Sequence, residues 1–403
     1  MTAPWLAVHG HFYQPPRENP WLDQVPVQDS ATPYHDWNER VTAECYARNA
    51  AARLLDAHNR IVRIVNTYAR ISFDVGPTLL RWLARHAPDV YGAILDADRA
   101  SRQAHFGHGN ALAHPYAHLI LPLASPRDRR TQIRWGLVDF ERRFRRRPEG
   151  MWLPETAVDV PTLEALAEHR IAFTILAPHQ VSRVRDGPDS PWRPVGEDEL
   201  DWTVPYRCRL PGGRSIVVFF FDPQTSRAVS FEGLLHDGEA LARRLAGPLL
   251  PADGRRIRVV ATDGETYGHH HPFGEMALAY ALERVASTGE ARLTTLASYL
   301  AAHPPAQEVE IREGTSWSCP HGLARWTSDC GCRTREGTHQ RWRAPLREAV
   351  GWLAERLDRL YEEHGGRVLR DPWAARDDAV DLIDPEPGAV EAFFARHGTD
   401  PRE

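Results

Sequence analysis

The sequence has no apolar run that approaches the roughly 20 residues needed by a membrane-spanning helix. Its start lacks a basic region followed by an apolar one, so it does not read as a signal peptide, and we expect a cytoplasmic protein. Five cysteines, an odd number, argue against a disulfide framework. A net charge of −5 gives no electrostatic reason to expect a nucleic-acid or anionic-membrane partner.

The composition is that of an ordinary globular protein, with 42% hydrophobic and 26% charged residues. A chain of 403 residues is long enough for a barrel-type domain of roughly 250 residues and a smaller addition. We therefore expect one large domain over residues 1–305 and a helical region over residues 306–403.

Short apolar runs alternate with helical patterns along the first part of the chain, which is typical of a parallel α/β fold. The predicted strands are residues 5–9, 61–66, 150–155, 172–178, 215–221 and 257–263. The predicted helices between them include residues 41–55, 78–85 and 161–169. Farther on, residues 344–361 carry an apolar stripe that predicts a helix packed on the barrel, and residues 390–396 carry another short helical pattern.

Several polar side chains follow directly where an apolar run stops, which is where parallel barrels place their reactive groups. Glu155 follows one run, close to the aromatic Trp152, and Asp263 and Glu265 follow another. Like charges this close raise one pKa and favour a protonated carboxyl, which a general acid requires. The purely structural alternatives are a helix cap or surface position for Glu155 and a solvated acidic turn for Asp263 and Glu265.

Two carboxylates brought together from distant strands are the apparatus of glycosidic cleavage. One carboxylate attacks the anomeric carbon or activates water, and the other protonates the leaving oxygen. The pattern thus points to Glu155 and Asp263 as a catalytic pair.

Histidines are concentrated near the same strand ends. His9 and His11 lie on one face of the first strand, and further histidines stand at positions 105, 108, 114, 118 and 269–271. A His-x-His pair suits a metal, but neutral imidazoles also bind sugar hydroxyls, which is the role we favour; backbone-satisfied histidines are the remaining alternative. We therefore assign no metal ligand in this site and expect no cofactor there.

The loop over residues 315–332 is rich in Trp and Cys, and we expect it to contribute to the active-site cleft. Cys319, His321, Cys330 and Cys332 are enough for a four-coordinate structural zinc, although their spacing is not that of a standard finger. A redox-sensitive thiol pair and buried unligated cysteines are the alternatives.

These motifs resemble those of glycoside hydrolase family 57, over roughly residues 5–345. His9, His11 and Gln14 look like the family's amino-terminal motif, and residues 44–46 resemble an element of the helix that follows. Trp152 and Glu155 look like the nucleophile motif, and Asp263 and Glu265 like the acid/base motif. The resemblance implies an irregular (β/α)7 barrel followed by a helical region, and activity on α-glucans like that of α-amylases, 4-α-glucanotransferases and branching enzymes.

By this resemblance Glu155 is the nucleophile, Asp263 the proton donor and Glu265 an orienting group. The implied substrate-binding residues are His9, His11, Gln14, Asn110, His118, Trp152, Glu265, Tyr267, His269, Trp317 and Trp342. One departure stands out: the family commonly has Glu at the position of Asn110, which places the chain in a divergent branch.

The main hypothesis is a retaining α-glucan hydrolase or transglycosylase, since water and sugar acceptors use the same two carboxylates. A metal-dependent carbohydrate deacetylase, with Asp263 and histidines as ligands, is one alternative. A glucan-binding protein that has lost catalysis is another, suggested by Asn110.

Overall fold

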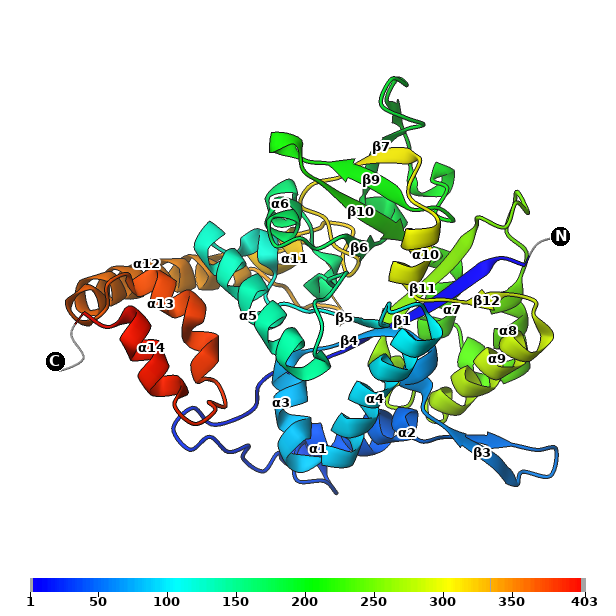
Figure 1. Ribbon diagram of the computed structural model, residues 1–403, viewed down its shortest axis with the longest axis horizontal. Coiled ribbons are helices and arrows are strands. Elements are labelled where there is room, and N and C mark those ends of the chain that lie inside the picture. Colours follow the sequence, from blue (N-terminus) through cyan, green and yellow to red (C-terminus); the bar gives the residue numbers. More distant parts are fainter. Residues whose placement is uncertain (1–2, 334, 400–403) are drawn as a thin grey trace.

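The computed structural model describes residues 3–333 and 335–399 (Figure 1). The strands are β1 (Trp5–Phe12), β2 (Ala52–Leu55), β3 (Ile61–Val65), β4 (Ser72–Val75), β5 (Ala111–Leu112), β6 (Phe173–Leu176), β7 (Val181–Arg185), β8 (Arg193–Pro194), β9 (Tyr206–Arg209), β10 (Ser215–Phe220), β11 (Ile257–Asp263), β12 (Arg292–Leu293) and β13 (Gln307–Ile311). The helices are α1 (Trp37–Val41), α2 (Ala47–Ala50), α3 (Pro77–His86), α4 (Pro88–Ala104), α5 (Pro126–Phe144), α6 (Val160–Glu168), α7 (Pro223–Phe231), α8 (Gly238–Ala246), α9 (Gly274–Thr288), α10 (Leu296–Ala302), α11 (Ala324–Thr327), α12 (Arg343–Val368), α13 (Pro372–Asp378) and α14 (Ala389–His397).

Parallel segments form an irregular ring. Strands pair in the order β11, β1, β4, β5, and a bridge from Ala113 to Met151 adds the next segment. A bridge from Gly150 to Phe173 leads on to β6, which pairs with β10. The Asp222 N–H donates to the Val259 carbonyl at 2.7 Å and connects the end of β10 to β11. The expected irregular barrel is confirmed.

Alternate residues of the ring strands pack on opposite sides. Side chains from β1, β5, β6, β10 and β11 meet in one buried cluster, which includes Ala7, Phe173, Phe219 and Val259. Because side chains alternate along a strand, His9 and His11 share the inner face with Ala7. The opposite faces pack against the covering helices, as the apolar runs predict.

A mixed sheet extends the ring beyond β10 in the order β9, β13, β7, β8. Strand β13 is parallel to β9 and antiparallel to β7. Residues 307–311 therefore belong to this sheet, although they follow the predicted boundary at residue 305. The division into residues 1–305 and 306–403 stays a prediction.

The prediction of a barrel strand at residues 61–66 is wrong. Strand β3 forms a separate hairpin with β2, and Ile61, Val62 and Ile64 are more than half exposed. The ring uses β4 instead, a four-residue strand that is fully buried although it contains Ser72 and Asp74. Partners on both sides bury β4, so its position does not depend on hydrophobicity of its own.

The predicted helix at residues 41–55 begins earlier and ends at Ala50. Asp36 caps it by accepting hydrogen bonds from the N–H groups of Asn38 and Glu39. Its middle, Thr42–Tyr46, is a π-helical turn, a feature often found at functional sites. The helices predicted at residues 78–85 and 161–169 are confirmed as α3 and α6.

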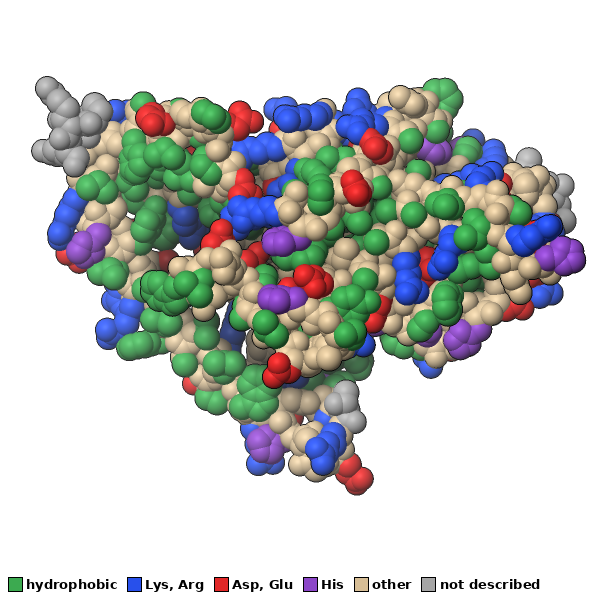
Figure 2. All heavy atoms as spheres, turned by 90° about the horizontal axis from the view of Figure 1, so that it is seen from below, with side chains coloured by type: hydrophobic (Ala, Val, Ile, Leu, Met, Phe, Trp, Pro, Cys, Tyr) green, Lys and Arg blue, Asp and Glu red, His purple; other side chains and the backbone are tan. Residues whose placement is uncertain are grey.

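The predicted helix at residues 344–361 exists as α12, but its apolar stripe is not buried on the barrel. Leu346, Val350, Leu353, Leu357 and Leu360 are each about half exposed. Hydrophobic side chains are visible around the C-terminal helices on the face drawn in Figure 2. Among the described residues, no helix combines the length and apolar character that crossing a bilayer requires.

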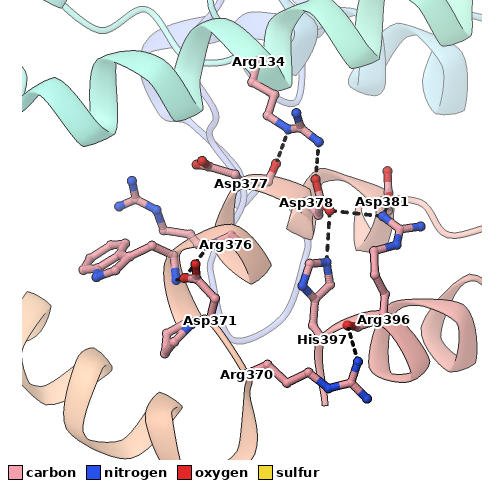
Figure 3. A network of polar contacts seen from close by, with 12 residues as sticks. Arg134, Arg370, Asp371, Arg376, Asp377, Asp378, Asp381, Arg396 and His397 are labelled. Carbon is pink, nitrogen blue, oxygen red and sulfur yellow. Dashed lines mark hydrogen bonds and ion pairs between the residues drawn. The ribbon is translucent and has the colours of Figure 1, made fainter. Parts of the chain in front are cut away.

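Helices α13 and α14 attach to α5 through polar contacts (Figure 3). Arg134 of α5 pairs with Asp378 and also donates to the Asp377 carbonyl at 3.1 Å. Asp378 in turn accepts from His397 and Arg396 of α14, at 3.0 and 3.1 Å. This network holds α13 and α14 against α5.

Candidate active site

A cleft of about 440 Å³ lies at the carboxyl ends of the ring strands. Its lining residues are His11, Tyr13, Gln14, Arg17, Trp37, Val41, His118, Glu155, Asp263, Glu265, His269 and His270. The structure thus brings together seven residues that the sequence predicts for the site: His11, Gln14, His118, Glu155, Asp263, Glu265 and His269. Glu155 and Asp263 line the same cleft, which is the first requirement if two carboxylates are to act on one molecule.

Glu155 stands in a strained turn directly after the ring segment that ends near Met151. Its φ is 57° and that of Thr156 is 48°, so two consecutive non-glycine residues adopt the left-handed conformation. Buried contacts hold this turn: Thr156 Oγ1 donates to Gln180 Oε1, and Gln180 Nε2 donates to the Thr156 carbonyl. Strain that is stabilised by neighbours is typical of functional positions.

Trp317, from the Trp- and Cys-rich loop, fixes both ends of Glu155. Its indole N–H donates to Glu155 Oε2 at 3.3 Å, and its backbone N–H donates to the Glu155 carbonyl at 3.0 Å. The ring also contacts Trp152 edge-on, with centroids 5.0 Å apart. A bridge between Val158 and Thr315 aligns the loop with the residues that follow Glu155.

Asp263 ends β11 and lies exposed on the open side of the cleft. Protein atoms nevertheless surround its carboxylate, and this desolvation raises its pKa, with the charges of Glu155 and Asp74 acting in the same direction. The nearby His11 opposes the rise. A reachable carboxyl with a raised pKa suits proton donation.

Glu265, two residues on, is buried in the wall of the cleft. Its Oε1 accepts from the Tyr46 hydroxyl at 2.5 Å and from the Tyr13 N–H at 3.0 Å. Burial, reinforced by the charge of Asp263, raises its pKa to about 8 despite these hydrogen bonds. Glu265 is therefore a neutral acid at pH 7, and the π-helical turn supplies Tyr46 as its partner.

A buried aspartate orients the two histidines of β1. His9 Nε2 lies 3.0 Å from Asp74 Oδ1, and His11 Nδ1 lies 2.8 Å from Asp74 Oδ2. Burial raises the Asp74 pKa to about 6, so the group is mostly ionised at pH 7 and accepts from both imidazoles. The Nε2 lone pair of His11 then faces His118 Nε2, 3.2 Å away. Sequence reasoning missed Asp74, whose signal was a single acid in a short strand.

The side chain of His118 lies between those of His11 and Glu155. Its Nε2 lies 3.2 Å from His11 Nε2 and 3.9 Å from Glu155 Oε1. Burial, strengthened by the neighbouring imidazole, lowers the pKa of His118 to about 4, and burial lowers that of His11 to about 4. Both rings are neutral at pH 7 and can exchange hydrogen bonds with sugar hydroxyls.

Three groups of side chains among the described residues have the chemistry to hold a metal, and one of them, His35, Asp36 and Glu39, is mostly exposed. One nitrogen from each of His11, His114 and His118 lies within 4.8 Å of the others, and His114 Nε2 is buried without a partner among the described residues. The third group comprises Cys319, His321, Cys330 and Cys332. The absence of a metal ligand in the cleft stays a prediction.

The remaining predicted site residues do not line the cleft. His9, Trp152 and Tyr267 are buried behind it, and Trp152 stacks on His9 with centroids 4.8 Å apart. Asn110 is buried and donates to the carbonyls of Tyr68 and Ile71, each at 2.6 Å. Trp342 precedes α12 and is 54% exposed.

Comparison with known families agrees with this geometry. The profile of glycosyl hydrolase family 57 matches residues 5–312. The chain belongs to glycosyl hydrolase family 57. A domain of unknown function (DUF3536) matches residues 338–403, and no curated protein matches the sequence significantly. The family match does not favour the deacetylase or the non-catalytic alternative.

Solved structures share the family 57 fold at low identity. The chain is similar to a 4-α-glucanotransferase from Thermococcus litoralis, with TM-score 0.58 and 17% identity over 91% of this chain and 48% of that one. It is similar to an exo-type maltose-forming amylase from Pyrococcus sp. ST04, with TM-score 0.63 and 15% identity over 85% and 60%. A branching enzyme from Thermococcus kodakaraensis gives TM-score 0.55 and 15% identity over 80% and 75%. The chain thus spans about half to three fifths of the first two relatives, and these likenesses show the fold alone.

The cleft of this family 57 chain also contains residues that sequence reasoning missed. Tyr13 stacks on His118 with ring centroids 4.4 Å apart, and Trp37 adds a second aromatic surface to the lining. Arg17 donates to Gln14 Oε1 at 2.8 Å. Tyr13 and Arg17 follow the His-x-His motif directly, so that proximity was an available signal. Trp37 lies on α1 and had no such marker.

Proposed function

We propose that this family 57 chain is a retaining hydrolase or transglycosylase of α-linked glucose polymers or oligosaccharides. Glu155 acts as the nucleophile and Asp263 as the proton donor. The observation that carries the proposal is that two carboxylates from strand ends 108 residues apart line one cleft, and that Asp263 has a raised pKa. The expected cytoplasmic location stays a prediction.

The chemistry has two halves. Asp263 gives its proton to the glycosidic oxygen while Glu155 Oε attacks the anomeric carbon, which forms a glycosyl-enzyme ester and frees the leaving sugar. Asp263, now ionised, takes a proton from water or from a sugar hydroxyl, and that oxygen displaces Glu155. Water as the acceptor gives hydrolysis, and sugar gives transfer.

The surroundings of Glu155 support its role. An attacking carboxylate must keep its charge and its orientation. The Trp317 indole N–H donates to Glu155 Oε2, and His118 Nε2 lies 3.9 Å from Glu155 Oε1. The neutral imidazoles of His11 and His118 supply hydrogen-bonding groups, and Tyr13 and Trp37 supply aromatic surface on which sugar CH faces stack. These are the ordinary elements of a sugar site.

The test uses Glu155→Ala and Asp263→Asn, with the exposed Glu197→Gln as a matched control. Incubation with maltoheptaose and with amylose, followed by chromatography, should show products with the wild type and the control. We expect each site variant to lose at least about 10³-fold in kcat while its circular dichroism is unchanged. Wild-type rates in either variant would refute the catalytic role assigned to that residue.

Azide separates the two roles. In Glu155→Ala a small anion can occupy the space of the lost carboxylate and attack the anomeric carbon, so we expect a glycosyl azide of inverted configuration. In Asp263→Asn the nucleophile remains, so a product azide should keep the substrate's configuration. The same configuration from both variants would contradict the assignment.

A further inference from the structure

The loop between β13 and α12 brings four metal-binding side chains to one point. This Cys/His cluster consists of Cys319, His321, Cys330 and Cys332. Cys319 Sγ lies 3.8 Å from Cys332 Sγ and 4.0 Å from Cys330 Sγ. His321 Nδ1 lies 3.4 Å from Cys332 Sγ and 3.7 Å from Cys319 Sγ. All four ligand atoms lie within 4.8 Å of one another.

These distances are those of a tetrahedral zinc shell. With Zn–S of about 2.3 Å and Zn–N of about 2.0 to 2.1 Å, tetrahedral angles place sulfurs about 3.8 Å apart and sulfur and nitrogen about 3.6 Å apart. A disulfide needs about 2.05 Å, so no pair of these cysteines is bonded, and all three are free. Thiol hydrogen bonds alone are weak and give no reason for three thiols and an imidazole to converge.

The backbone and the neighbours are also suited to a metal. Gly331, between two of the ligands, has a φ of +83°, which lets the flanking cysteines turn toward one centre. Arg343 Nη1 lies 3.6 Å from Cys330 Sγ and can offset the excess charge of three thiolates on one divalent ion. We propose that the Cys/His cluster binds one structural zinc ion.

The position of the cluster connects it to the cleft. Trp317 precedes the first ligand by two residues, and its backbone and indole N–H groups both bond to Glu155. A bridge between Ser316 and Cys319 makes the intervening turn tight. Zinc would therefore fix Trp317 against Glu155. This consequence for catalysis rests on the proposed role of Glu155, whereas zinc binding itself does not.

The primary test is metal content. Wild-type protein, purified without chelator and after addition of zinc, should contain one zinc per chain by mass spectrometry of the metal. Cys330→Ser and Cys332→Ser should lose most of it, whereas Cys208→Ala, at a buried cysteine outside the cluster, should keep it. Less than about a tenth of an equivalent in the wild type would overturn the proposal, as would a full equivalent in both serine variants.

A second measurement needs no variant of the cluster. Cobalt(II) added to metal-free wild-type protein should give the intense visible absorption of a tetrahedral thiolate site, and zinc should abolish it. A weak spectrum typical of octahedral oxygen and nitrogen ligands would contradict the proposal. It would also fail if His118→Ala lost the metal and Cys330→Ser kept it, since the ion would then lie in the cleft.

The activity readout comes last and distinguishes two failures. We expect Cys330→Ser to lower kcat at least about tenfold with little change in KM, because Trp317 loses its fixed position. A stoichiometric metal that leaves when the serine variants are made, together with unchanged kcat, would preserve the zinc site and overturn only its connection to Glu155.

Discussion

The buried carboxyl of Glu265 lowers the stability of the folded protein at neutral pH, and Glu265→Gln should reveal this cost. The carboxyl has a pKa of about 8 in the folded protein against an ordinary value of 4.5. Between these values the unfolded chain is ionised while the folded chain holds a proton, so stability is fully present below pH 4.5 and is lost as the pH rises toward 8. Glutamine is neutral in both states and removes this dependence.

The magnitude follows from the linkage. At pH 7 the difference is about 2.5 pH units, which at about 1.36 kcal/mol per unit gives about 3 kcal/mol in favour of the variant. At pH 5 the same calculation gives less than about 1 kcal/mol. For 403 residues and an unfolding entropy of about 2.1 cal/mol/K per residue, about 3 kcal/mol raises Tm by about 4 °C.

The assay is thermal unfolding of the wild type, Glu265→Gln and the surface control Glu197→Gln at pH 5, 6, 7 and 8. The gain in Tm should grow with pH for the first variant and stay near zero for the control. Glutamine keeps an acceptor for Tyr46 and for the Tyr13 N–H, so the wall of the cleft should survive. A Glu265→Gln protein no more stable than the wild type at any pH would refute the reasoning.

Three further predictions concern other groups of the site. His11 has a pKa of about 4 in the folded protein against an ordinary 6.5, so its contribution to stability is present above pH 6.5 and is lost as the pH falls. Urea titrations should show the free energy of unfolding of the wild type falling by about 2 kcal/mol from this group by pH 5, and that of His11→Asn falling by less. Asn110→Asp replaces an amide that donates to two buried carbonyls, so the urea midpoint should report a loss of about 2 to 4 kcal/mol, and an unchanged midpoint would contradict this. Trp317→Phe removes the indole N–H that donates to Glu155, so kcat should fall about tenfold with KM nearly constant. An unchanged kcat would show that this hydrogen bond does not contribute to catalysis.

The ring segments that the sequence predicts are those with their own hydrophobic signal. The runs at β1, β6, β10 and β11 are largely covered on both faces, so most of their residues are apolar, and this is visible in one sequence. Strands β4 and β5 have four and two residues and are buried by their neighbours. Conversely, β3 has the composition of a buried strand but lies in an exposed hairpin. Pairing partners decide these cases, and partners are set by the whole fold.

The same division holds for the site. Glu155, Asp263 and His11 follow strong strand signals, so their meeting at one end of the barrel was predictable. Asp74 was not, because only the register that pairs His11 with Asp74 across β1 and β4 makes it a partner of the histidines. Nor could the sequence choose between two late tryptophans. The contact with Glu155 belongs to Trp317, because its loop pairs with the residues that follow Glu155.

In the proposed mechanism, access rather than pKa alone decides which acid of the Asp263 and Glu265 pair donates the proton. Glu265 has the pKa better suited to carrying a proton at neutral pH, but it is only 8% exposed and its Oε1 is occupied by two donors. Asp263 lies open to the cleft at the end of β11, where a glycosidic oxygen can reach it. A neutral Glu265 adds no second negative charge beside Asp263, and in the proposed mechanism this favours release of the Asp263 proton during turnover. If this is right, Glu265→Gln keeps kcat within about tenfold while Asp263→Asn does not, and a reversed order would assign proton donation to Glu265.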